Sequence, residues 1–180
     1  MCLLNKLIAF VLILCSSSIV LAQNDWSLVL KGKVESALRT VYETDQIKLE
    51  AIELEESVNE AAPANLNDHL FKVFDDNSFK GYAYVAQAPS MKNVFDYLVI
   101  FNKNLSIEKS KVLIYREQHG RQIGSVRWLS QFNGMTISDQ PELGKEIDGI
   151  SGATISARGM TVAINQLLAS LSLAKEKGVL

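Results

Sequence analysis

Cysteine is scarce in this sequence, and the positions of its two cysteines exclude several kinds of chemistry. Cys2 and Cys15 are the only cysteines among 180 residues, and both lie in a leading stretch that is predicted to be removed on export. The mature chain would then contain none, although it would work in an oxidising compartment. Disulfide bonds, thiol catalysis and metal sites built on cysteine are therefore excluded.

Histidine and excess charge are scarce as well. The two histidines, His69 and His119, stand far apart among scattered carboxylates, which is not a ligand set, so we expect no metal site. The net charge of -2 gives no basic patch that would suggest nucleic acid. Internal repeats and low-complexity tracts are absent too. A protein or a small molecule is the expected partner.

The first 22 residues have the pattern of a secretory signal. Lys6 precedes an apolar run over residues 7–14, and a small-residue cleavage site follows, ending at Ala22. Extended to residue 21, the apolar stretch could instead be an uncleaved membrane anchor, but serines at 16–18 interrupt it and leave it short for a span. We expect an exported protein, periplasmic or on the outer face of the cytoplasmic membrane.

The pattern downstream predicts one α+β domain. Apolar residues at helical spacing predict an amphipathic helix over residues 26–41, and the acidic run 53–60 fits a solvated helix face. Strands are predicted at 47–51, 81–88, 95–102 and 107–116. Short turns at 89–93 and 103–105 make the later strands antiparallel, with helices packed on one face of a twisted sheet. Four aromatic residues are assigned to sheet packing: Tyr82, Tyr84, Phe95 and Tyr97.

A seven-residue motif, Asp148-Gly149-Ile150-Ser151-Gly152-Ala153-Thr154, stands just before a predicted C-terminal helix. The buried face of that helix is predicted from five residues: Met160, Ile164, Leu167, Leu168 and Leu171. Free backbone N–H groups and the positive end of the helix dipole suit such a place to a phosphate, and Gly152 allows close approach of backbone. The hydroxyl of Thr154 could there carry a phosphoester.

The motif resembles the D-x-x-[ST]-G-A-T sequence of FMN-binding domains, as found in the flavin-carrying components of the sodium-pumping NADH:quinone reductase and of the Rnf electron-transport complex. In that family a magnesium-dependent flavin transferase splits FAD and attaches FMN through its phosphate to the last threonine. The resemblance implies that Thr154 carries covalent FMN. The transferase would recognise the other matching residues: Asp148, Ser151, Gly152 and Ala153.

A looser resemblance covers roughly residues 70–171. Together with the signal pattern, it divides the chain into three expected segments: a signal peptide (1–22), an N-terminal helix and strand extension (23–69) and the FMN-binding domain (70–180). Family members have an E-T-P-G-x-G loop, of which residues 117–122 keep the glutamate and the first glycine. The implied cofactor-binding residues in this loop are Glu117, Gln118, His119, Gly120 and Arg121.

Individual roles follow for some of these positions. Gln118 and Arg121 are predicted to line the ring edge, and His119 to donate a hydrogen bond or relay a proton to reduced flavin. Ser156 matches a hydroxyl usually found two residues after the threonine, and a helix N-cap is the alternative role for it.

The leading hypothesis is a flavoprotein that transfers electrons between membrane or periplasmic redox partners. It would need the flavin transferase as a further partner, and no catalytic residue is assigned. Two alternatives remain open. The chain could be a flavin-dependent reductase component acting on a small extracytoplasmic acceptor, or a non-catalytic binding protein without flavin.

Overall fold

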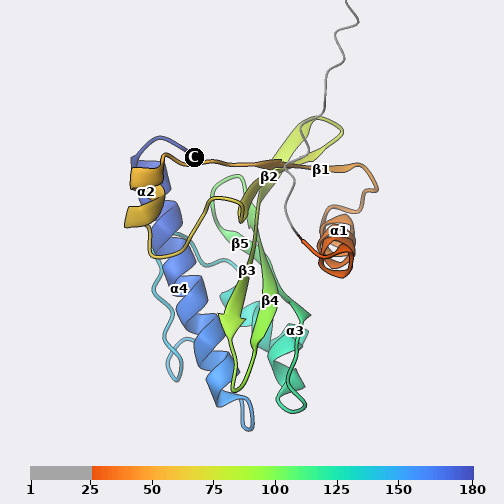
Figure 1. Ribbon diagram of the computed structural model, residues 1–180, viewed down its shortest axis with the longest axis vertical. Helices are drawn as coiled ribbons and strands as arrows, with labels where there is room; N and C mark the ends of the chain where they lie inside the picture. The colour runs from red at the N-terminus through yellow and green to blue at the C-terminus, as the bar shows by residue number, and fades with distance from the viewer. Residues whose placement is uncertain (1–25) are drawn as a thin grey trace, which may run out of the picture.

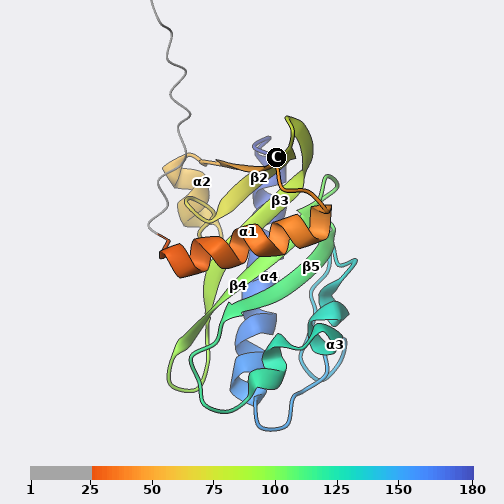
Figure 2. The same cartoon turned by 90° about the vertical axis from the view of Figure 1, so that its right-hand side faces the viewer.

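The computed structural model describes residues 26–180, which form a five-stranded sheet with a long helix on each face (Figures 1 and 2). The elements are α1 (Leu28–Tyr42), β1 (Ile47–Ala51), α2 (Glu56–Ala61), β2 (Leu70–Asp75), β3 (Ser78–Pro89), β4 (Val94–Asn102), β5 (Ile107–Ile114), η1 (Arg121–Gly124), α3 (Val126–Leu129), η2 (Ser130–Phe132) and α4 (Thr154–Glu176). The predicted export signal and both cysteines lie outside the described residues. Within the described part, no helix has the length and hydropathy needed to span a bilayer.

The sheet is antiparallel throughout, and its spatial order β1-β2-β3-β4-β5 follows the chain. This confirms the predicted α+β class. Strand β2 was not predicted, because its apolar residues do not alternate: Leu70 and Phe71 are adjacent and both buried. Asp76 and Asn77, both in the left-handed backbone region, make the tight turn that joins β2 to β3.

Helices cover both faces of the sheet, so the prediction that they pack on one face is wrong. Tyr84 faces the core under α4, whereas its neighbour Val85 faces the core under α1. Successive residues of a strand point to opposite faces, and in the central strands both sets are apolar. Figure 2 shows α1 in front of the sheet and α4 behind it. The predicted sheet-packing role of the four aromatic residues is confirmed, since all are buried in the α4-side core.

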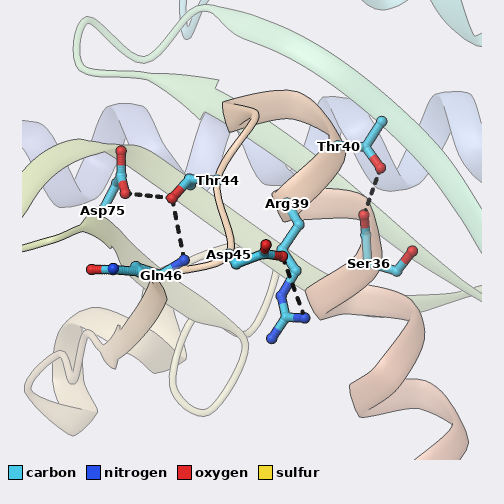
Figure 3. Close-up of polar contacts among 7 residues, drawn as sticks. All are labelled: Ser36, Arg39, Thr40, Thr44, Asp45, Gln46 and Asp75. Carbon is cyan, nitrogen blue, oxygen red and sulfur yellow. Dashed lines mark hydrogen bonds and ion pairs between the residues drawn. The ribbon is translucent and has the colours of Figure 1, made fainter.

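Polar contacts fix the end of α1 to the turn between β2 and β3 (Figure 3). The Thr44 hydroxyl donates to Asp75 Oδ1 at 2.8 Å and accepts from the backbone N–H of Gln46 at 3.2 Å. Hydrogen bonds from Thr44 and Lys80 lower the pKa of the Asp75 carboxyl below its ordinary value. The segment that follows helix α1, which was predicted for residues 26–41, is thereby joined to the end of β2.

Helix α4 packs closely on the end of β3. The five residues predicted to form its buried face are all fully buried. Gly159 lies on the same side, and a Cβ there would overlap the carbonyl oxygen of Pro89, the last residue of β3. The absence of a side chain at Gly159 therefore allows the first turns of α4 to approach the hairpin formed by β3 and β4.

Candidate functional site

A cleft of about 570 Å³ opens where β3 turns into β4, beside the start of α4. Both segments lie at the lower end of the molecule in Figure 1. The cleft volume lies within the roughly 300–1,000 Å³ typical of small-molecule sites. Three segments line it: residues 91–93 of the β3–β4 turn, residues 115–119 after β5, and residues 152–156 of the motif and α4.

The motif forms a tight turn that ends in the first residue of α4. The carbonyl oxygen of Ile150 accepts from the backbone N–H of Ala153 at 3.0 Å and from the Thr154 hydroxyl at 3.3 Å. Gly152 takes the left-handed conformation with φ 78°, and there is open space where a Cβ would stand. Thr154 is exposed and lines the cleft. Its hydroxyl is therefore presented to solvent at a fixed position.

The first residue of the motif is held through its backbone. The indole N–H of Trp128 donates to the Asp148 carbonyl at 2.7 Å, and the Asp148 N–H donates to the Gln131 side chain at 2.9 Å. Trp128 is buried, with its ring edge-on to Phe132. Because α3 and η2 hold Asp148 by main-chain atoms, its carboxylate remains exposed.

Within residues 26–180, no side-chain hydrogen bond caps the N-terminus of α4. The N-cap is Ala153, and the first helical bond there runs from the Ala157 N–H to the Ala153 carbonyl at 2.9 Å. The first-turn N–H groups of a helix have no intrahelical partner, so this end is suited to an anion. The alternative prediction of Ser156 as N-cap is wrong, because the helix begins two residues earlier. Ser156 is buried and bonds instead to the Tyr115 hydroxyl at 2.9 Å.

Glu117 holds the β3–β4 turn. Its Oε1 accepts from the Ser90 hydroxyl at 2.7 Å and from the backbone N–H groups of Lys92 and Asn93 at 2.6 and 2.8 Å. Those hydrogen bonds, with that from Lys92 the largest, lower the pKa of the Glu117 carboxyl from 4.5 to about 2. Glu117 thus fixes one wall of the cleft by binding the turn that forms it.

Because the pKa of Glu117 is lower in the folded chain, the effect of Glu117→Gln on stability should depend on pH. A carboxyl whose folded pKa is depressed contributes stability above its ordinary pKa, and the contribution is lost as the pH falls through the folded value. We expect the wild-type chain to have a higher Tm than Glu117→Gln at neutral pH, and the difference to close between pH 4.5 and about 2.

Thermal denaturation followed by circular dichroism across that pH range measures the difference. Glu53→Gln, at an exposed position outside the helices and strands, is the matched control for loss of one charge. A Tm difference between wild type and Glu117→Gln that stays constant down to pH 2 would contradict the role of Glu117 in the turn.

Gly120 brings the loop against the motif. Its φ is 79°, in the left-handed region, and a Cβ there would lie 2.9 Å from the Ala153 Cβ and 2.9 Å from the Tyr115 hydroxyl oxygen. A larger residue would have to displace one of these groups. Gly120 therefore contributes by close packing and not through a side chain.

The structure brings most of the predicted site residues together. The predicted residues that line the cleft are Thr154, Gly152, Ala153, Ser156, Glu117, Gln118 and His119. The other four predicted residues do not line it: Asp148 and Ser151 lie in the exposed part of the motif, Arg121 begins η1, and Gly120 precedes it.

Other lining residues were not assigned to the site from sequence. The residues concerned are Met91, Lys92, Asn93, Tyr115, Arg116 and Ile155. Residues 91–93 were predicted as a hairpin turn, but their approach to α4 depends on tertiary packing. Tyr115 was included in the predicted strand 107–116. It directly follows β5, and a position next to the end of a strand was the sequence feature that could have suggested a ligand contact.

Comparisons with known proteins agree with the position of this cleft. Residues 92–169 match the family model of the FMN-binding domain. Among solved structures, NqrC of Shewanella oneidensis is similar at 19% sequence identity, with a TM-score of 0.49. That match covers 62% of this chain and 61% of NqrC, less than two thirds of its length. The search of curated proteins found no match. The family match includes every residue lining the cleft except Met91, so the part of the chain that forms the cleft resembles an FMN-binding domain.

Proposed function

We propose that the protein carries FMN bound through its phosphate to Thr154 Oγ1 and transfers electrons between membrane or periplasmic redox partners. One observation carries this proposal: an exposed threonine hydroxyl lines a cleft at the uncapped start of α4, inside the FMN-binding domain match. Export to the periplasm is part of the proposal and is supported by the pattern of residues 1–22.

The residues of the cleft fit a phosphate attached at Thr154. Among the described residues the N-cap of α4 makes no side-chain hydrogen bond, and the helix dipole there favours negative charge. The space beside Gly152 leaves room for phosphate oxygens. Attachment would replace the hydroxyl proton of Thr154 with the phosphoryl group of FMN as the transferase releases AMP from FAD.

The walls of the cleft fit a flat, largely apolar ring. Met91 and Ile155 are 70% and 53% exposed although both are apolar, and each lines the cleft. Gln118 and His119 supply polar groups on another wall. Bound flavin would supply the redox chemistry of the protein. The chain itself would position the ring, shield it from water and set its potential through these contacts.

Intact-mass analysis of the exported protein, made with and without an active flavin transferase, tests the proposal. We expect a mass increase of FMN less one water only with the transferase, together with in-gel fluorescence that survives denaturation. Unmodified, colourless protein in the presence of active transferase would contradict covalent attachment and would support a binding protein without flavin.

A further inference from the structure

Tyr115 stands on the α4 side of the sheet at the junction of the three segments that line the cleft. It follows β5 directly, and its ring packs against that of Phe95 with a centroid separation of 5.9 Å. Phe95 is fully buried in the core under α4. The phenol ring is consequently supported from behind by packed core, while Tyr115 itself remains partly exposed to the cleft.

The hydroxyl of Tyr115 is also held in place by its neighbours. It lies 2.9 Å from Ser156 Oγ in the first turn of α4, and it lies close enough to Gly120 to exclude a Cβ there. Two hydroxyls that share one hydrogen bond retain a second hydrogen that can be donated elsewhere. Both residues line the cleft, but Ser156 is only 3% exposed, whereas Tyr115 is partly exposed and offers more of its surface to a ligand.

The other polar side chains of the cleft are less well placed for a defined contact. Glu117 Oε1 is used by three hydrogen bonds to the β3–β4 turn. Gln118 and His119 are exposed on the loop. A rigid aromatic side chain with a polar end is also the type that contributes large contact area with little loss of conformational entropy.

We propose that Tyr115 is a flavin-contacting residue of this protein, positioned by Ser156, with its phenol ring against the isoalloxazine. This inference rests on the proposed function, because it requires flavin in the cleft. It adds a contact with the flavin ring to those predicted from the sequence for Gln118 and Arg121.

Flavin fluorescence tests the contact. A phenol in contact with an excited flavin donates one electron to it and recovers that electron within the same cycle, so the emission is quenched without net reaction. Phenylalanine is too difficult to oxidise to do so. We expect the fluorescence yield of bound flavin, at equal loading measured by intact mass, to rise several-fold in Tyr115→Phe.

Tyr84→Phe is the matched control. Tyr84 lies on the same side of the sheet and loses an equivalent hydroxyl, which bonds to the Asn65 carbonyl at 3.0 Å, but it lines a different cavity. Its flavin yield should equal that of wild type. The phenylalanine ring retains the packing of Tyr115 on Phe95, and the Tm of each variant verifies that the fold is intact.

The outcomes separate this inference from the proposed function. Loaded Tyr115→Phe with the same yield as wild type would overturn the ring contact and leave covalent attachment standing. If the mass shows no attachment, the same variants are compared with FMN added in solution, where a yield difference confined to Tyr115→Phe still supports the contact. Absence of FMN binding by both routes would overturn both proposals.

Discussion

Thr154→Ala is expected to abolish covalent flavin loading completely. The variant removes the one oxygen to which the phosphate would be bound, and an alanine at an exposed helix start costs little in folding. The exported variant, made with the transferase, should show the unmodified mass and no in-gel fluorescence. Its Tm without flavin should remain close to that of wild type.

Thr154→Ser is the control, since it keeps a hydroxyl at the same place beside the Ile150 carbonyl. We expect this variant to be loaded, with its extra mass mapped by peptide analysis to residue 154. Flavin found on Ser151 or elsewhere in Thr154→Ala would contradict the assignment of the attachment site.

Gly159→Ala is expected to lower the free energy of unfolding, against the usual preference of helices for alanine. Alanine in a helix interior normally gains roughly 0.5–1 kcal/mol over glycine. Here the added methyl would overlap the carbonyl oxygen of Pro89, which belongs to backbone and cannot rotate away. Overpacking of this kind typically costs about 1–3 kcal/mol, so the balance should be destabilising.

Gly32→Ala provides the matched comparison in α1. Its added Cβ meets nothing within 4 Å, so the substitution should raise stability by roughly 0.5–1 kcal/mol. Urea denaturation of both variants gives the two changes, which should have opposite signs. If Gly159→Ala is also more stable than wild type, the close packing of α4 on β3 is contradicted. A displaced α4 should also reduce flavin loading in Gly159→Ala.

Local patterns predicted the elements well where one physical signal was dominant. The helical spacing of Leu30, Val34 and Leu38 predicted α1, and these side chains are buried as expected. The adjacent pair Leu70 and Phe71 gave no alternation, so β2 was missed. The placement of α1 on the second face could not be predicted from any one segment, because it depends on central strands that are apolar on both sides.

The candidate site also has a part that local sequence predicts and a part that depends on tertiary packing. Thr154 and the turn before it could be predicted because the motif and the following helix are local in sequence. The β3–β4 turn lies beside the motif for two reasons. Gly159 has no side chain that would overlap the Pro89 carbonyl oxygen, and Glu117 accepts hydrogen bonds from the turn. Such contacts join residues that are far apart in the chain. No local sequence pattern predicts which of these residues will contact one another. The hydrogen bond of Ser156 to Tyr115, in place of the alternative N-cap role, has the same cause.

The order of the strands has a consequence for when the cofactor can be added. Each strand pairs with the one made just before it, so the sheet can assemble progressively as the chain is released. Helix α4 comes last among the described elements and supplies one side of the cleft. If the chain is exported as proposed, the cleft would form only after α4 had crossed the membrane. The proposed attachment of FMN to Thr154 would then follow the folding of α4.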